Sequence, residues 1–401
     1  MNDVTPVGEI PQPARVRFSG TEASLFRILL RGSLLQIPTF GFYRFWLITD
    51  IRRHLWSHTE IGGDAFEYTG RGRELLIGFL IALAILAPIY VAYFLLALEA
   101  ERLQAFASVP LFLILYVLGH YAVFRARRYR ATRTVFRGLR FWMTGSGWAY
   151  AGRAIFWDFV TVLTLGFAYP WRSAALERYK LGHTRYGNIG GAFVGRGFVL
   201  FKRGGWLWAL FLASAALAGV LLASGQWVSG IVLAVAVSLA SPFLLPVFRA
   251  MELRWWLEGV RFGPVEMASD LAIGAVTWCY AKTVLAWLAY GIAAAVLLGL
   301  VAAVAGGLFA GLQGLDVSRL EALSLPAAVL GGIVGVVVYV AFLLGLDIIR
   351  RLFLDRGIWA VAAHSVTLRN IEAVDSVAGT DAREAGSVGE GLLDALDMGG
   401  F

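Results

Sequence analysis

The chain has 401 residues, of which 59% are hydrophobic and 15% charged, and its formal net charge is +8. Soluble domains carry roughly 25% charged residues, so this composition excludes an ordinary soluble protein and predicts an integral membrane protein. The single cysteine, Cys279, excludes an internal disulfide and a cysteine-based metal cluster.

The first 24 residues are polar and contain prolines, without the apolar stretch and cleavage site of a secretory signal. We therefore expect this start to stay in the cytoplasm. Six later runs are apolar enough for membrane helices, which need roughly 20 residues each, and they pair into three hairpins. The runs are 74–98, 105–124, 205–223, 227–248, 283–312 and 326–346.

The charges predict which side each segment faces. The three turns inside the hairpins together hold four acids and two arginines, whereas residues 125–148 carry seven arginines and no acid. Residues 171–204 carry seven Lys or Arg and one acid, Glu177. Because Lys and Arg collect on the cytoplasmic side, the segments between hairpins and both termini are expected there. This bias also accounts for the net charge without a nucleic-acid partner.

Two further apolar runs, 25–46 and 154–171, end in similar aromatic segments, TFGFYRFW and TLGFAYPW. The second lies between two strongly basic segments, so a single crossing would place one of them outside. We expect both runs to be re-entrant or interfacial helices, with full crossing as the alternative. The interface anchors would be Tyr43, Trp46, Tyr169 and Trp171, since Tyr and Trp prefer the membrane–water boundary.

The two aromatic segments belong to a longer internal repeat. At an offset of 125, residues 39–72 and 164–197 are identical at eleven of 34 positions. Weaker copies of a basic stretch followed by an alternating stretch occur elsewhere, and period-two alternation ended by glycine predicts strands. The alternating stretches are 14–20, 64–70, 139–145, 190–195, 260–265 and 365–370. We expect them to pair into one small cytoplasmic sheet.

These residues resemble the YjgN-like bacterial inner-membrane family, a domain of unknown function numbered 898. The resemblance rests on FSG (18–20), TFGFY (39–43) with Trp46, RRHL (52–55) and GGDAFEY (62–68), and it covers about residues 15–370. It implies a polytopic inner-membrane protein and supplies no catalytic residues. The chain departs from the family pattern by a proline directly before the threonine of TFGFY, in PTFGF.

Candidate site residues are few. Asp158 lies inside an apolar run, and intramembrane acids are functional candidates by default. It could line a transport path, with Arg153 or neighbouring arginines as its partner, or form a structural ion pair. The arginine block could bind anionic lipid headgroups or simply fix topology. The block comprises Arg125, Arg127, Arg128, Arg130, Arg133, Arg137 and Arg140.

No nucleotide-binding, hydrolase or metalloprotease motif is present, so we expect no enzyme activity, no cofactor and no metal site. The tail from residue 371 is acidic, and its end (385–401) has apolar residues at helical spacing. That end could dock on the protein's own basic face or on a partner protein, or remain solvated. The oligomeric state is open.

The sequence therefore predicts an all-α polytopic membrane protein with three transmembrane hairpins, two re-entrant or interfacial helices and a small cytoplasmic β-sheet built from repeated modules. The predicted function is non-enzymatic: organising or binding anionic lipid or partner proteins at the cytoplasmic face of the bacterial inner membrane. The alternative is a transporter or channel with Asp158 in the path. The expected segments are a polar tail (1–16), module 1 (17–73), hairpin 1 (74–124), a basic segment with module 2 (125–204), hairpin 2 (205–248), module 3 (249–282), hairpin 3 (283–350) and an acidic tail (351–401).

Overall fold

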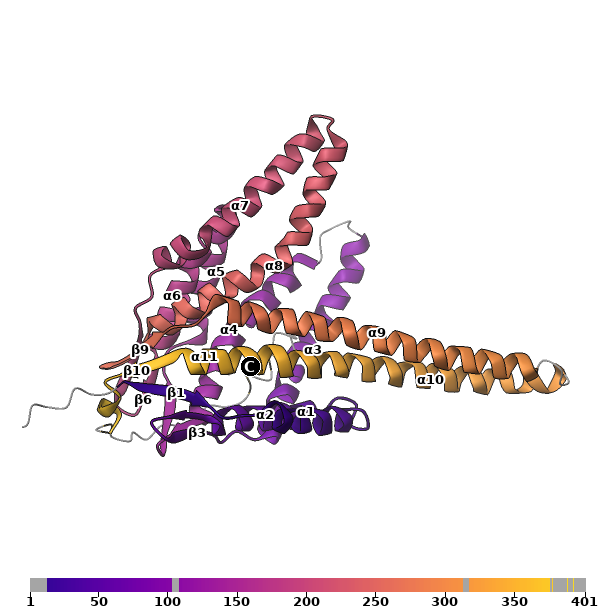
Figure 1. Ribbon diagram of the computed structural model, residues 1–401, viewed down its shortest axis with the longest axis horizontal. Helices are drawn as coiled ribbons and strands as arrows, with labels where there is room; N and C mark the ends of the chain where they lie inside the picture. Colours follow the sequence, from indigo (N-terminus) through magenta and orange to yellow (C-terminus); the bar gives the residue numbers. More distant parts are fainter. Residues whose placement is uncertain are drawn as a thin grey trace, which may run out of the picture.

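The computed structural model describes residues 13–102, 108–312 and 317–375, together with Val377, Val388 and Leu392. In this part of the chain, ten short strands form one closed antiparallel barrel, in the spatial order β1-β10-β9-β8-β7-β6-β5-β4-β3-β2. The barrel lies at one end of the molecule, and helical hairpins extend from it (Figure 1). The strands are β1 (Ala14–Phe18), β2 (Thr59–Ile61), β3 (Asp64–Tyr68), β4 (Thr134–Phe136), β5 (Leu139–Met143), β6 (Thr184–Tyr186), β7 (Ile189–Phe193), β8 (Val260–Phe262), β9 (Val265–Ser269) and β10 (Val366–Arg369).

One unit occurs five times along the described residues: a strand leads into two antiparallel helices, and the chain returns as the neighbouring strand. The fifth unit is longer, because α10 continues through a π-helical turn, η1 (Arg350–Asp355), into α11 (Arg356–Ser365). A short 3-10 turn, η2 (Ile371–Val374), follows β10. The helix pairs are α1 (Glu22–Gln36) with α2 (Arg44–Ser57), α3 (Gly72–Arg102) with α4 (Ser108–Arg133), α5 (Gly147–Leu163) with α6 (Tyr169–Gly182), α7 (Gly197–Ala223) with α8 (Trp227–Gly259), and α9 (Ile273–Leu312) with α10 (Val317–Ile349).

Consecutive units are joined by two-residue β-turns. The first turn residue has a positive φ in each: 61° at Gly62, 47° at Arg137, 52° at Gly187 and 53° at Gly263. Such turns match the twist of the strands they connect, so each short strand pairs directly with the next long one. All helices therefore leave one end of the barrel and all tight turns lie at the other. The pairing of β1 with β10, with Ala14 opposite Leu368, closes the ring.

The inside of the barrel is filled by side chains. The Phe136 and Tyr186 rings, from strands β4 and β6 that do not pair with each other, have centroids 6.3 Å apart, and Phe141 of β5 contacts Phe262 of β8 at 5.9 Å. The Tyr186 hydroxyl donates a hydrogen bond to the Phe136 carbonyl at 2.9 Å. Contacts between non-adjacent strands run across the interior, so the barrel is a packed core, as in other small barrels.

The expected all-α class with a small cytoplasmic sheet is wrong, because the strands close into a complete barrel and the protein is of mixed class. Strands do form at the six alternating stretches, but short partners such as β2, β4 and β6 have three residues each. Three residues are too few for alternation to be recognised, and without these partners the closure of the sheet cannot be inferred from sequence.

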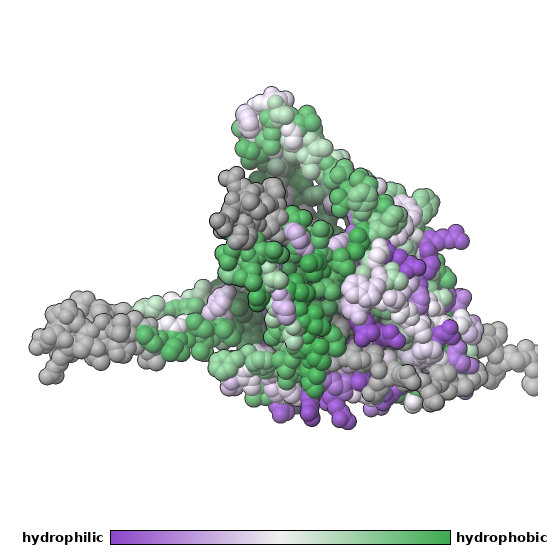
Figure 2. Space-filling model, turned by 180° about the vertical axis from the view of Figure 1, so that it is seen from behind, coloured by the Kyte–Doolittle hydropathy of each residue, from purple (hydrophilic) through white to green (hydrophobic). Residues whose placement is uncertain are grey.

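The helices form a ring above the barrel, because each hairpin contacts the next: α2 with α3, α4 with α5, α6 with α7, α8 with α9, and α10 with α1. The three long hairpins splay away from one another (Figure 1). Their surface is apolar, while hydrophilic residues gather toward the barrel end (Figure 2). An apolar surface of this extent on helices of this length is suited to lipid.

Among the described residues, six helices are long and apolar enough to cross a membrane: 72–98, 109–133, 197–223, 227–259, 273–304 and 331–365. They correspond to the six runs expected from the sequence. Several extend beyond those runs on the barrel side, because the basic or mixed segments that follow an apolar run continue as helix before entering a strand.

Candidate functional site

The α5–α6 hairpin is turned by the segment TLGF. The Thr164 hydroxyl donates to the Val160 carbonyl at 2.9 Å and accepts from the Ala168 N–H at 3.0 Å, which caps both helices at once. Leu165 and Gly166 have φ values of 50° and 91°. The apolar run 154–171 therefore bends back on itself.

This turn rests against α7. The Trp208 indole N–H donates to the Leu165 carbonyl at 2.6 Å. A Cβ added to Gly166 would lie 2.8 Å from Trp208 Nε1, so only glycine fits between the turn and this indole.

An apolar, partly open cavity of about 680 Å³ lies beside the turn and is lined by residues of the α5–α6 turn, α7 and α8. Sites for small molecules usually measure about 300–1,000 Å³. Aromatic side chains from α7 and α8 and a proline of α8 contribute to its lining. The wall includes Phe167, Phe201, Phe211, Pro242, Leu245 and Phe248.

One end of the cavity is polar. The Tyr169 hydroxyl donates to Glu252 Oε1 at 2.6 Å, and Arg249 Nη1 lies 2.7 Å from Glu252 Oε2. The Arg249 side chain is 51% exposed, so part of its guanidinium remains open to another acceptor. Arg249 directly follows the apolar run 227–248, which places it where a membrane helix leaves the hydrocarbon.

Asp158 lies in a cluster of polar side chains between α4, α5 and α6. Arg172 of α6 forms its ion pair, His120 Nε2 lies 3.0 Å from Asp158 Oδ2, and the Tyr116 hydroxyl donates to the same oxygen at 2.5 Å. Arg153 lies elsewhere, over the Tyr179 ring at 4.5 Å. Arg153, the partner named from the sequence, does not pair with Asp158; Arg172, which was not named, makes the pair, and the acid has several further contacts.

A second cluster nearer the barrel was missed by the sequence reasoning. Glu177 pairs with Lys180 and with Arg127 Nη1, the latter at 3.3 Å, and accepts from the Trp256 indole at 2.9 Å. Burial would raise the pKa of Glu177, but the Lys180 and Arg127 cations hold it below its usual value. The available signal was that Glu177 is the one acid in a segment of seven cations.

The seven arginines expected to bind lipid do not gather on one surface. Arg127 pairs with Glu177, and Arg133 pairs with Glu74 at 2.9 Å. Arg137 lies at the turn end of the barrel, with its Nε 2.6 Å from Asp64 Oδ2. The other four are partly buried in α4 or β5: Arg125, Arg128, Arg130 and Arg140.

The expected interface anchors flank the two hairpin turns. Tyr43 stacks on Trp46 with ring centroids 6.1 Å apart, and Trp46 and Trp171 are each 37% exposed. Tyr169 differs from the other three, because its hydroxyl is bound to Glu252 at the polar end of the cavity.

Most of the expected docking segment 385–401 lies outside the described residues. Leu392 is described, and its side chain is buried against Ala82 and Leu86 of α3 and Ala122 and Ala126 of α4. At this residue the tail contacts the protein's own helices.

The sequence model of one protein family, described as a bacterial protein of unknown function (DUF898), matches residues 13–395. No curated protein and no solved structure matches the chain.

Proposed function

The chain belongs to the bacterial DUF898 family, and from this premise we propose that it is a non-enzymatic inner-membrane protein that binds a membrane lipid in the cavity between the α5–α6 turn, α7 and α8. The family's description states no activity, so the proposal is argued from the cavity. Its apolar wall and single polar end match a molecule with an acyl chain and a charged headgroup.

In the proposed orientation, the barrel and both termini lie in the cytoplasm. The arginine-rich segments enter or leave the barrel, and positive charge favours the cytoplasmic side. The α1–α2 and α5–α6 hairpins then dip into the inner leaflet as re-entrant elements. Their tips support this placement, because Phe40 is 92% exposed and Leu165 is 68% exposed.

An anionic headgroup fits the polar end best. Arg249 keeps part of its guanidinium open, and arginine binds phosphate through paired N–H donors. Tyr169 and Glu252 hold the Arg249 side chain in place, which limits the conformational freedom lost on binding.

Filling the cavity tests the proposal. Ser241 lines it, whereas Ser238 lies one turn earlier on α8 and is exposed outside it. Native mass spectrometry of the purified protein should show a co-purified phospholipid. Ser241→Phe should reduce its occupancy at least tenfold, while the matched Ser238→Phe should leave it unchanged. Equal occupancy in both variants would reject the cavity as the lipid site.

Transport past Asp158 is the second candidate, favoured by the contacts of this acid with His120 and Tyr116 on a membrane helix. The filled barrel argues against a path along its axis. Purified protein in liposomes that moves protons or small ions, with loss on Asp158→Asn, would favour transport over lipid binding.

A further inference from the structure

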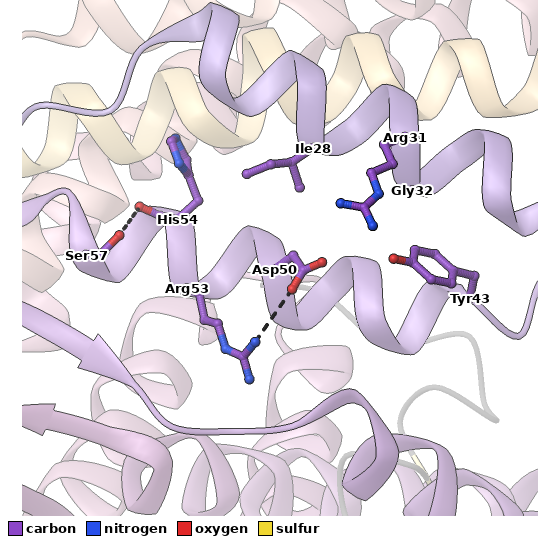
Figure 3. Close-up of a pocket in the computed structure, with 8 residues that line it drawn as sticks. All are labelled: Ile28, Arg31, Gly32, Tyr43, Asp50, Arg53, His54 and Ser57. Atoms are coloured by element: carbon purple, nitrogen blue, oxygen red, sulfur yellow. Dashed lines mark hydrogen bonds and ion pairs between the residues drawn. The ribbon is translucent and has the colours of Figure 1, made fainter.

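A polar groove of about 280 Å³ lies between α1 and α2, separate from the lipid cavity. Its lining includes Arg31 from α1, Tyr43 just before α2, and Asp50, Arg53 and His54 from α2. Figure 3 shows the Arg31 guanidinium reaching across the gap toward α2, between Tyr43 and Asp50. Two cations, Arg31 and Arg53, and one anion, Asp50, therefore line the same space.

Neither Arg31 nor Asp50 is fully used within the protein. Arg31 makes no hydrogen bond or ion pair with another described residue. Asp50 is 3.7 Å from Arg53 Nη1, too far for a hydrogen bond, while Arg53 Nη2 donates to the Gly70 carbonyl at 2.9 Å. His54 is neutral at pH 7, because burial and the nearby His58 and Arg356 lower its pKa to about 4.

The hairpin does not need these charges to form. In α5–α6, the positions 125 residues after Arg31 and Asp50 are Phe156 and Ala175. At the positions equivalent to Ile28 and His54 of the groove, α5–α6 has Arg153 and Tyr179, and the guanidinium lies 4.5 Å from the centre of the tyrosine ring. The same helix–turn–helix thus exists without the charged pair, so the fold of the hairpin does not account for these charges in α1–α2.

The two charges also lie at one depth. Arg31 is five residues before the end of α1, and Asp50 is six residues after the start of α2. At 1.5 Å per residue, both lie roughly 8–9 Å below the helix ends. With the exposed Phe40 tip in the hydrocarbon, this depth corresponds to the headgroup layer.

We propose that the groove binds a phosphoethanolamine headgroup, with its phosphate on Arg31 and its primary ammonium on Asp50. A phosphate alone would leave Asp50 repelling it, and an ammonium alone would leave Arg31 unpaired. A zwitterion with adjacent charges satisfies both. The inference rests on the proposed placement of α1–α2 in the inner leaflet for its lipid source.

The test compares headgroups on the full-length protein after removal of lipid in detergent. Dihexanoyl phosphatidylethanolamine, phosphatidylcholine and phosphatidylglycerol are titrated onto the Ser241→Phe variant, whose lipid cavity is filled, and followed by native mass spectrometry. Phosphatidylethanolamine should bind at least tenfold more tightly than the other two. Phosphatidylcholine lacks ammonium N–H donors, and phosphatidylglycerol lacks the cation for Asp50.

Arg31→Phe and Asp50→Ala each introduce the residue that stands at the equivalent position of the α5–α6 hairpin, so that folding is retained. Arg31→Phe should weaken phosphatidylethanolamine binding at least tenfold. Asp50→Ala should remove the preference for phosphatidylethanolamine over phosphatidylcholine, which a purely structural role would not do. Arg27→Ala, one turn earlier on α1 and also exposed, should change nothing.

In this Ser241→Phe background, equal binding of phosphatidylethanolamine and phosphatidylcholine, or an unchanged preference after Asp50→Ala, would overturn the proposal. Free phosphoethanolamine should compete at the groove wherever the hairpin lies, so its failure to compete would reject the groove itself. If the free headgroup competes and acyl chains add no affinity, a membrane lipid would be rejected as the molecule that supplies the headgroup. Because Ser241→Phe fills the lipid cavity, the binding measured in this background belongs to the groove.

Discussion

Thr39 and Thr164, 125 residues apart, make the same pair of hydrogen bonds. Each hydroxyl donates to the carbonyl four residues before it, at 2.6 Å to Leu35 and 2.9 Å to Val160, and accepts from the backbone N–H four residues after it. The residue that follows has a positive φ in both turns, as does the glycine after it. One side chain thus ends one helix and starts the next in each short hairpin.

Removing either hydroxyl should destabilise its hairpin. Thr39→Val and Thr164→Val keep the side-chain shape but leave one backbone N–H without its partner, which costs about 1–2 kcal/mol of unfolding free energy. Thr277→Val is the matched control, because the Thr277 hydroxyl only donates within its own helix, to the Ile273 carbonyl. Unfolding in mild detergent measures the three variants, and equal losses in all of them would contradict the capping role.

Replacing each of the two turn glycines by alanine distinguishes the effect of backbone strain from the effect of packing. Gly41 and Gly166 have φ values of 84° and 91°, so alanine is strained at both by about 1–2 kcal/mol. A Cβ at Gly41 meets nothing within 4 Å, whereas at Gly166 it meets Trp208. Gly166→Ala should therefore be the more destabilising and should shift the Trp208 fluorescence. Equal melting temperatures for the two variants would show that the turn does not press on Trp208.

The Asp158–Arg172 pair can be replaced by the residues of the other short hairpin. Ser33 and Leu47 stand 125 residues earlier. Asp158→Ser alone leaves a partly buried guanidinium unpaired and should cost about 3 kcal/mol. The double variant Asp158→Ser, Arg172→Leu should recover at least half of that loss. No recovery would mean that Asp158 is held mainly by His120 and Tyr116.

His54 should make stability depend on pH. Its folded pKa of about 4 lies below the unfolded value of 6.5, so the unfolded chain binds more protons between these values. This contribution is complete above pH 6.5 and is lost as the pH falls toward 4, by roughly 3 kcal/mol. Unfolding at pH 7.5 and 4.5 should show a smaller difference for His54→Gln than for the unaltered protein. The same stability difference between the two pH values in both proteins would contradict the assignment of this pH dependence to His54.

The sequence predicted the long helices because a run of roughly 20 apolar residues has few other stable forms. It predicted the barrel poorly, since strands such as Thr134–Phe136 are too short for a period to appear. Their pairing depends on tight turns and on contacts between residues far apart in the chain. Closure through β1 and β10 joins residues more than 350 positions apart.

The candidate sites were predicted in part. Asp158 was identified from its apolar surroundings, but Arg153 is five residues earlier on the same helix and faces another side. Arg172 follows the return turn, so the hairpin geometry was needed to place it opposite Asp158. The cavity between the α5–α6 turn, α7 and α8 has no linear signal, because its lining comes from three separate stretches that meet only after folding.

The closing contact between β1 and β10 has a consequence for synthesis. Chains grow from the N-terminus, so the strand edge of β1 has no second neighbour until Val366–Arg369 has been made. By then, the apolar helices of the first four units have already left the ribosome. The helices of these four units therefore enter the bilayer while their common base is an open sheet, and β10 closes the barrel only afterwards.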